Sequence, residues 1–310
     1  MKILITGGAG YIGSRLVPFL LDLNYQIIVL DNFYYNQTSL LPVCTNENLE
    51  IINGDVRDEA TLKRALVGVD LIIPLACLTG APACKANPDY ATSTNLEAIR
   101  LLLQLRRNDQ KIIYPNTNSG YGIGTKEELC NEKSPLNPVS LYGILKNQAE
   151  KLILESGNSV AFRFATVFGV SNRMRTDLLV NDFVYKAITH KEITLFESHY
   201  RRNFLYIGDA VKAFHFTIIN FDKMINNTFN IGLSSANLTK MELCKVIKSE
   251  IPSLLIKEEE FSTDPDKRDY LVSNDKIRKI GFEAKVSIQK GILELKKSYV
   301  FINPENHRNI

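Results

Sequence analysis

A glycine-rich segment near the start of the chain is the feature that most constrains its fold. Residues 6–13 read TGGAGYIG, so glycines recur at the spacing G-x-x-G-x-x-G between an apolar run and a helical pattern. Such glycines permit a tight turn and let a pyrophosphate approach the helix N-terminus, where unpaired N–H groups favour an anion. The segment therefore predicts a dinucleotide site. Its expected contact residues are Gly7, Gly10, Tyr11, Ile12 and Gly13.

Short β-branched runs alternate with longer helical patterns through the first half of the chain. This order is typical of a parallel sheet with helices on both faces, and it predicts an α/β fold of the Rossmann type with a doubly wound parallel sheet. The expected strands are Lys2–Thr6, Gln26–Leu30, Leu49–Asn53, Val69–Pro74, Lys111–Pro115 and Ser159–Phe164. The expected helices are Tyr11–Leu23, Glu59–Val67, Thr94–Arg106 and Leu141–Glu155.

After Phe168 this alternation breaks down. Beyond that point we expect Arg-rich loops and three further elements, at Asp182–Thr189, Asp209–Asn220 and Thr228–Ile231. The sequence predicts a cofactor-binding domain over residues 1–168, with a return segment near 203–231, and a smaller C-terminal α/β substrate-binding lobe over residues 169–310. No flexible linker separates the two, so we expect them to share chain crossings.

Composition narrows the class of protein. At 45% hydrophobic residues the chain can bury a sizeable core, and its net charge of +3 gives no reason to expect nucleic acid or an anionic membrane as a partner. The five cysteines include no C-x-x-C pair and the four histidines have no metal-ligand spacing, so neither disulfides nor a metal site is predicted. Without a targeting segment or a bilayer-length apolar run, the chain is expected to be a soluble, cytoplasmic protein.

Asp31 directly follows the second expected strand. A carboxylate at this position accepts hydrogen bonds from the diol of an adenosine ribose and repels a 2′-phosphate, which favours NAD over NADP as cofactor. Asp55 ends the third strand on the same edge and is expected near the adenine. The other cofactor-binding candidates at these strand ends are Asn32, Val56, Leu75 and Ala76.

Tyr142 and Lys146 form a Tyr-x-x-x-Lys pattern on the expected helix Leu141–Glu155, where a spacing of four places both side chains on one face. A tyrosine with a pKa of about 10 is a weak base at neutral pH, but an adjacent ammonium and a cationic nicotinamide favour its phenolate. The polar segment Asn116–Gly122 follows the fifth strand. Because ligands gather at the carboxyl ends of parallel strands, we expect these side chains to face the nicotinamide.

The order of these motifs resembles the extended short-chain dehydrogenase/reductases, the NAD-dependent nucleotide-sugar epimerase/dehydratase family. The likeness extends over nearly the whole chain, because Arg163–Gly169 is similar to the family's strand-six motif and Arg202–Asp209 to its later substrate-domain motif. The resemblance implies a nucleotide-sugar-binding role for residues 169–310 and a homodimer formed through Thr94–Arg106 and Leu141–Glu155.

The same resemblance implies a role for each residue of the catalytic group. Tyr142 takes a proton from a sugar hydroxyl, usually O4, while hydride passes from the same carbon to NAD. Thr117 hydrogen-bonds that hydroxyl, Lys146 anchors the nicotinamide ribose, and Asn95 supports the cofactor. Two arginines, Arg202 and Arg268, are expected at the nucleotide diphosphate. The remaining substrate-binding candidates are Thr79, Gly80, Asn118, Ser119, Thr166, Arg173, Arg175 and Asn181.

Two departures from the family pattern carry information. Dehydratases follow the catalytic Thr with an Asp or Ser and then a Glu, whereas this chain has Asn118 and Ser119. Neither is an ordinary carboxylic acid or base, so dehydration is not expected. Thr166 stands where many relatives have an Asn near the diphosphate, which weakens that expected contact.

A narrower likeness extends to the GDP-D-glycero-α-D-manno-heptose 4-dehydrogenase subgroup of bacterial capsule pathways. The segments that carry it are 78–85, 114–124, 173–183, 232–240 and 264–270. It implies oxidation at C4 of a GDP-linked mannoheptose, release of the 4-keto sugar, and reoxidation of bound NADH by a 2-oxo acid such as 2-oxoglutarate. A 4-epimerase that returns hydride to the other face stays open. A non-catalytic NAD-sensing module is a third alternative, but it has no need of Tyr142.

Overall fold

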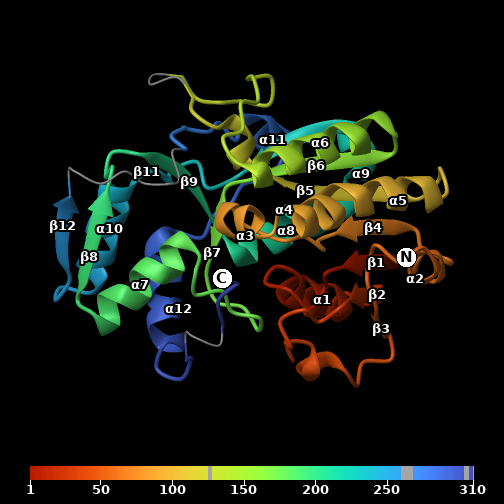
Figure 1. The fold of residues 1–310 in the computed structure, drawn as a ribbon, viewed down its shortest axis with the longest axis horizontal. Coiled ribbons are helices and arrows are strands. Elements are labelled where there is room, and N and C mark those ends of the chain that lie inside the picture. Colours follow the sequence, from red (N-terminus) through yellow and green to blue (C-terminus); the bar gives the residue numbers. More distant parts are fainter. Residues whose placement is uncertain (125–127, 260–267, 304–306, 310) are drawn as a thin grey trace.

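The computed structural model describes residues 1–124, 128–259, 268–303 and 307–309. These residues contain a seven-stranded sheet of parallel neighbours in the order β10-β6-β5-β4-β1-β2-β3 (Figure 1). Its strands are β1 (Lys2–Thr6), β2 (Gln26–Asp31), β3 (Leu49–Asn53), β4 (Leu71–Pro74), β5 (Lys111–Thr117), β6 (Ser159–Phe164) and β10 (Asn227–Ile231). The strand order reverses beside β1, as in doubly wound Rossmann folds, so the predicted α/β fold is confirmed.

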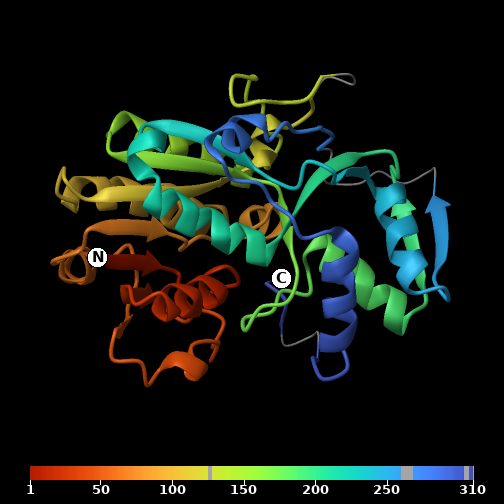
Figure 2. The same ribbon diagram turned by 180° about the vertical axis from the view of Figure 1, so that it is seen from behind.

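Helices cover both faces of this sheet, as Figures 1 and 2 show from opposite sides. One face carries α1 (Gly13–Asp22) and α8 (Ile207–Ile219), and the other carries α2 (Glu59–Ala65), α5 (Ala98–Leu105) and α6 (Leu141–Glu155). Side chains alternate along a strand. Ile3 and Ile5 therefore pack on the side of α1, whereas Leu4 packs in a second core on the side of α6.

Two element boundaries that matter for the site differ from expectation. β5 runs to Thr117 rather than Pro115, because its last residues continue the ladder with β6, where Thr117 lies opposite Phe164. α1 begins at Gly13 rather than Tyr11, because the preceding residues form the turn that joins β1 to the helix. Thr117 is thus held by sheet hydrogen bonds, and the glycine loop precedes the helix up to Ile12, with Gly13 as the first helical residue.

Pro18 lies inside α1, where it cannot donate a backbone hydrogen bond to the carbonyl of Ser14. That carbonyl oxygen instead accepts a hydrogen bond of 3.3 Å from Nδ2 of Asn172, which belongs to the C-terminal half of the chain. A distant side chain therefore replaces the missing helical bond and ties the helix to that half.

The C-terminal half adds a three-stranded sheet, β11-β9-β7, and a two-stranded sheet, β12-β8. Their strands are β7 (Thr166–Phe168), β8 (Glu192–Phe196), β9 (Arg201–Tyr206), β11 (Asn237–Thr239) and β12 (Leu255–Glu259). The helices of this half are α7 (Leu179–Thr189), α9 (Phe221–Met224), α10 (Lys240–Glu250), α11 (Asp275–Ile280) and α12 (Ile288–Ser298). Shorter helical segments elsewhere are η1 (Leu41–Val43), α3 (Ala81–Ala86), α4 (Pro88–Thr92), η2 (Ser93–Glu97) and η3 (Asn118–Tyr121).

The expectation of Arg-rich loops after Phe168 was wrong for Arg201 and Arg202, which begin β9. This strand is paired on both sides and mostly buried, so its sequence lacks the polar alternation that marks a half-exposed strand. From β9 the chain passes through α8 and the short α9 into β10, which pairs with β6 in the main sheet. The domain boundary at residue 168 stays a prediction.

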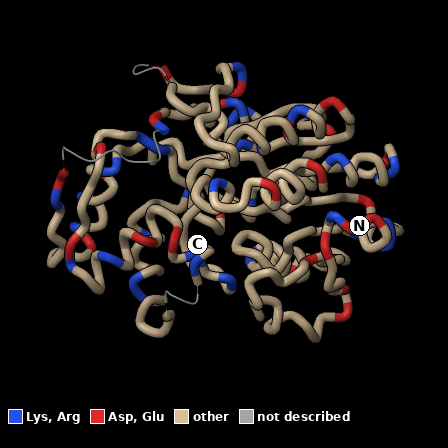
Figure 3. Tube along the Cα trace, in the orientation of Figure 1, with Lys and Arg blue, Asp and Glu red and all other residues tan. Residues whose placement is uncertain are grey.

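Lys and Arg residues are interspersed with Asp and Glu over the trace (Figure 3). No helix among the described residues has both the length and the apolar composition needed to cross a membrane. Over the same ranges, no three His, Cys, Asp or Glu side chains gather closely enough to hold a metal ion.

Candidate active site

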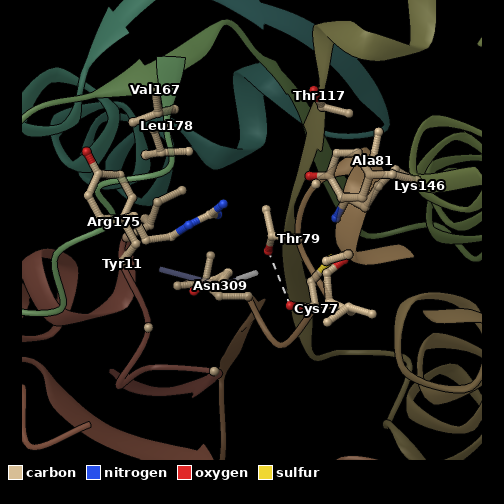
Figure 4. Close-up of a pocket in the computed structure, with 18 of the residues that line it drawn as sticks. Tyr11, Cys77, Thr79, Ala81, Thr117, Lys146, Val167, Arg175, Leu178 and Asn309 are labelled. Atoms are coloured by element: carbon tan, nitrogen blue, oxygen red, sulfur yellow. Dashed lines mark hydrogen bonds between the residues drawn. The ribbon is translucent and has the colours of Figure 1, made fainter. Parts of the chain in front are cut away.

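A cavity of about 1410 Å³ opens at the carboxyl ends of the central strands, between the main sheet and the C-terminal half. It collects loops that follow β1, β2, β3, β4, β5 and β6, which is where ligands bind in open α/β sheets. Figure 4 shows Tyr11 and Arg175 on one side of this cavity and Thr117 and Lys146 on the other. The expected cofactor end and the expected catalytic end therefore share one space.

The glycine loop forms one wall, and its glycines are required by close backbone contacts. Gly7 has a φ of +67°, and a Cβ there would lie 2.6 Å from the backbone nitrogen of Ala76. A Cβ on Gly13 would collide with the carbonyl of Gly8. No described residue accepts a hydrogen bond from the N–H groups of Tyr11 and Ile12. The N-terminus of α1 thus fits an anionic group such as a pyrophosphate.

Asp31 lines the cavity at the end of β2, with only 7% of the residue exposed. Its carboxylate accepts hydrogen bonds from the backbone N–H groups of Ala9 (3.0 Å) and Phe33 (2.8 Å) and from Nε2 of Gln37 (3.2 Å). Burial raises the pKa of Asp31, and these donors act against that effect. A 2′-phosphate here would bring further negative charge against a buried carboxylate. The hydroxyl groups of a ribose diol would instead donate hydrogen bonds to that carboxylate.

Asp55 and Asn32 lie together at the adjacent strand ends, where Nδ2 of Asn32 donates to the Asp55 carboxylate at 3.2 Å. The guanidinium of Arg57 donates to both carboxylate oxygens, at 2.8 and 2.7 Å, and lowers the pKa of Asp55 to about 2. Arg57 also lies 4.5 Å from the centroid of the Tyr90 ring. Sequence reasoning missed Arg57, although an arginine two residues after a strand-end acid is a signal for such a pair.

Tyr142 and Lys146 lie on α6, whose first turn is capped by Oγ of Ser140, which accepts from the N–H of Gly143 at 3.2 Å. The Lys146 ammonium is buried and lies 4.1 Å from the centroid of the Tyr114 ring. Burial lowers the pKa of Lys146. No described residue accepts a hydrogen bond from this ammonium, so it is suited to the hydroxyl groups of a ribose.

The environment of Tyr142 acts on its pKa in both directions. Burial raises the pKa above its ordinary range, and the thiols of Cys77 and Cys84 add to that effect. The cations that favour its phenolate are Arg175 and Arg268. From the sequence, this role was expected of Lys146 and the nicotinamide. Both arginines, which are distant from Tyr142 in the chain, were expected to bind the substrate.

Thr117 and Ser119 form a short hydroxyl chain in the cavity that Tyr142 also lines. Oγ1 of Thr117 donates to Oγ of Ser119 at 3.0 Å, and it accepts from the N–H of Ser119 at 3.1 Å. A guanidinium nitrogen of Arg268 also donates to Oγ of Ser119. Because this oxygen already accepts twice, the proton of the Ser119 hydroxyl is available to a ligand in the cavity.

A buried polar network behind the cavity fixes α6 against β5. Nδ2 of Asn116 donates to Glu150 and, at 3.1 Å, to Oδ1 of Asn147, while Oδ1 of Asn116 accepts from the N–H of Thr117 at 2.7 Å. Glu150 also forms an ion pair of 2.7 Å with Arg163. The network therefore sets the position of the helix that carries Tyr142 relative to the strand that ends at Thr117.

Three predicted contact residues do not line the cavity. The side-chain amides of two of them form hydrogen bonds with backbone groups, and the third amide is buried. Asn95 binds the backbone of Leu78, with its Oδ1 accepting at 2.8 Å and its Nδ2 donating at 2.9 Å, so it supports the cavity loop rather than touching a ligand. Asn181 accepts from the N–H of Gly169 at 3.0 Å. Asn118 is 1% exposed, and its amide has no hydrogen-bond partner among the described residues.

The other predicted residues all border the cavity. Thr79 donates to the carbonyl of Cys77 at 3.2 Å (Figure 4), and Arg202 lies 5.6 Å from the centroid of the Tyr270 ring. The remaining cavity-lining residues among the predictions are Gly10, Val56, Leu75, Ala76, Gly80, Thr166, Arg173 and Arg175. Of the segment 264–270 that carries part of the subgroup likeness, residues 264–267 lie outside the described residues.

A glycine loop, a buried acid at the end of β2 and a Tyr/Lys pair around one cavity define a dinucleotide-dependent enzyme of the short-chain dehydrogenase/reductase type. The chain belongs to the NAD dependent epimerase/dehydratase family, whose model matches residues 3–232. The family prediction and the prediction of NAD as cofactor are confirmed by this match. The open N-terminus of α1, the carboxylate of Asp31 and the buried ammonium of Lys146 fit that cofactor.

Individual relatives carry different activities in their names. UDP-glucuronic acid decarboxylase 1 of Arabidopsis thaliana is 29% identical over 306 residues, which cover 94% of this chain and 68% of that protein. An uncharacterized UDP-glucose epimerase of Bacillus subtilis (strain 168) is 32% identical over 251 residues, with coverage of 75% and 77%. The solved UDP-glucose 4-epimerase of Thermotoga maritima with UDP-glucose superposes with a TM-score of 0.85 at 25% identity, covering 98% of this chain and 100% of that one. The chain is therefore related to enzymes of nucleotide sugars.

Proposed function

We propose that this protein oxidises C4 of a nucleotide-linked sugar to the 4-keto sugar. The observation that supports this reaction best is that Tyr142, Lys146 and Thr117 line the same cavity as the glycine loop and Asp31. A base, a hydroxyl that orients the substrate and a site for the hydride acceptor thereby border one cavity.

Each residue has a defined task in this reaction. Tyr142, as phenolate, takes the proton of the sugar O4 hydroxyl while hydride leaves the same carbon, and NAD supplies the hydride acceptor. The Thr117 hydroxyl forms a hydrogen bond with that O4 oxygen, and Lys146 holds the nicotinamide ribose. Arg268 favours the phenolate and, with Ser119, donates hydrogen bonds at the sugar end of the cavity.

After oxidation the keto sugar either leaves or is reduced again. We propose that it leaves, that the substrate is GDP-mannoheptose, and that a 2-oxo acid such as 2-oxoglutarate takes the hydride and becomes a 2-hydroxy acid. The five segments that resemble the 4-dehydrogenase subgroup support this choice. The absence of carboxylic acids at Asn118 and Ser119 argues against a third route, the elimination of water. With this substrate and reaction, the protein would be a cytoplasmic enzyme of capsular polysaccharide biosynthesis.

The second candidate is a nucleotide-sugar 4-epimerase. It uses the same oxidation, followed by rotation of the keto sugar and return of the hydride to its other face. The names of the Bacillus subtilis and Thermotoga maritima relatives favour it.

One incubation separates the two candidates. The enzyme is mixed with GDP-mannoheptose or UDP-glucose, with and without 2-oxoglutarate, and the products are followed by NMR. A 4-keto sugar formed with a stoichiometric 2-hydroxy acid is expected from the dehydrogenase. Catalytic formation of a C4 epimer without any 2-oxo acid would assign the protein to the epimerases, and Tyr142→Phe serves as the inactive control in either case.

We also propose that the protein is a homodimer formed through α5 and α6, which pack side by side on one face of the sheet. Ile144 of α6 is 40% exposed, and Leu101 and Leu105 of α5 are only partly buried. A second copy of this chain would cover these apolar side chains. Light scattering should give the mass of a dimer, and Ile144→Glu should give that of a monomer; a monomeric wild type would refute this interface.

A further inference from the structure

The segment between β7 and α7, residues 169–177, is fastened to the N-terminal end of α1. The hydroxyl of Tyr11 donates to the carbonyl of Gly169 at 2.7 Å, and Oγ of Ser171 donates to the carbonyl of Tyr11 at 2.7 Å. The N–H of Arg173 donates to Oγ of Ser14 at 3.0 Å. With the bond from Asn172 that replaces the missing donor of Pro18, these contacts bring a segment of the expected substrate lobe beside the glycine loop.

Arg175 extends from this segment into the cavity. Only 7% of the residue is exposed, and Figure 4 shows its guanidinium pointing from the side of Tyr11 toward Thr79. Its Nε and Nη2 atoms donate to the carboxylate of Asp177. No described residue accepts from its Nη1 atom. A buried guanidinium with donors left over, facing a cavity, indicates an anionic ligand.

Arg173 adds a second cation next to the first. Its guanidinium carbon lies 4.9 Å from the centroid of the Tyr35 ring, in the loop that follows Asp31. Its Nη2 atom donates to Oδ1 of Asn309 at 2.7 Å. Burial, together with the positive charge of Arg175, lowers the pKa of Arg173. Because Asp177 is shared with Arg175, the pair carries an excess of positive charge.

We propose that residues 169–177 form a cofactor clamp, in which Arg175 and Arg173 bind the pyrophosphate of NAD opposite the N–H groups of Tyr11 and Ile12. A pyrophosphate has two negative charges, and planar guanidinium groups match phosphate oxygens with paired hydrogen bonds. Arg173 and Arg175 then serve the cofactor rather than the nucleotide sugar. The clamp requires NAD as cofactor and is independent of the reaction at C4.

The test uses Arg175→Met on enzyme freed of cofactor, with calorimetric titration of NAD, ADP-ribose, adenosine and GDP. Loss of charge-assisted hydrogen bonds should weaken NAD and ADP-ribose by about 10- to 100-fold. Adenosine has no pyrophosphate and should bind as it does to the wild type, and GDP binding should also be unchanged. In the loaded enzyme, exchange of bound NAD for isotopically labelled NAD should be faster by a similar factor.

A weaker affinity of Arg175→Met for ADP-ribose could have three causes: the missing cation, the unpaired Asp177 carboxylate that it leaves behind, or the change in net charge. Three further variants distinguish these causes. Asp177→Asn should bind ADP-ribose at least as tightly as the wild type, because it frees more of the Arg175 guanidinium. The double variant Arg175→Met/Asp177→Asn removes the unpaired buried carboxylate and should still bind ADP-ribose weakly. Arg15→Met changes the net charge equally at an exposed position of α1 outside the cavity, and it should change the affinity by no more than about twofold.

Two results would overturn the clamp. If Arg175→Met binds ADP-ribose like the wild type but binds GDP more weakly, the arginines belong to the nucleotide-sugar site. If the double variant regains the wild-type affinity for ADP-ribose, the loss in Arg175→Met came from the unpaired carboxylate of Asp177 and not from a missing cation.

Discussion

Glu150→Gln should lower the free energy of unfolding by an amount that is large for a single substitution. The carboxylate of Glu150 receives hydrogen bonds from Nη2 of Arg163 at 2.7 Å and from Nε at 3.2 Å, and both side chains are buried. Glutamine keeps the shape but leaves the Arg163 cation without its carboxylate. Removing one partner of a buried pair costs about 3–5 kcal/mol. With an unfolding entropy of about 2.1 cal/mol/K per residue over 310 residues, the midpoint should fall by about 5–8 °C.

The same substitution should reduce catalysis, because Glu150 also accepts from Asn116, which precedes Thr117 and holds its N–H. A small shift of α6 against β5 misaligns Tyr142 with Thr117, and such shifts cost up to about 100-fold in rate. The assays are scanning calorimetry and single-turnover oxidation. Glu155→Gln is the control, since Glu155 lies on the same helix, is 59% exposed, and should change stability by no more than about 0.5 kcal/mol. If the two variants unfold at the same temperature, the reasoning about the buried pair is wrong.

Four further variants test individual parts of the site. Tyr142→Phe should keep NAD and nucleotide-sugar binding in calorimetry but oxidise about two to four orders of magnitude more slowly, and near-normal turnover would identify another base. Asp31→Ala should reduce the ratio of NAD affinity to NADP affinity measured by calorimetry. Tighter binding of NADP than of NAD by the wild type would refute the role of Asp31 in cofactor choice. Burial raises the pKa of Tyr142, so the rate of oxidation should rise with pH as the phenolate forms. Because Arg268 favours that phenolate, Arg268→Met should move this rise to higher pH. A pH profile that does not move, or that moves to lower pH, would contradict the effect of Arg268 on Tyr142. Gly13→Ala should lose bound NAD, measured by mass spectrometry after denaturation, because its methyl group collides with the backbone of Gly8; a full load of NAD would contradict this.

The parts of this protein that were predictable from sequence depend on local spacing. The G-x-x-G-x-x-G turn, the strand that ends at Asp31 and the four-residue step from Tyr142 to Lys146 each lie within one element or one turn. The alternation of short hydrophobic runs with helical patterns then predicted the parallel sheet. In the C-terminal half this reasoning missed β8, β9 and β12 and the helices α10, α11 and α12. Of these, β9 is mostly buried and lacks polar alternation.

What was not predictable depends on contacts between distant segments. The amides of Asn95 and Asn181 turn to backbone groups that only the folded chain brings near, and nothing in a short sequence window distinguishes them from ligand contacts. Arg175 was predicted at the substrate, but the hydrogen bonds of its segment to α1 bring it beside the glycine loop. The structure accounts for the burial of Asn118 but offers no reason for its unpartnered amide.

The most direct test of C4 oxidation follows a single deuterium atom. The enzyme is incubated with GDP-mannoheptose deuterated at C4 and then denatured, and the released cofactor is analysed by mass spectrometry. C4 oxidation with Tyr142 as the base predicts deuterium in the NADH released from the wild type and almost none, after the same short incubation, in the cofactor released from Tyr142→Phe. Unlabelled NADH from the wild type, or NADH that acquires its label from a sugar deuterated at another carbon, would contradict it.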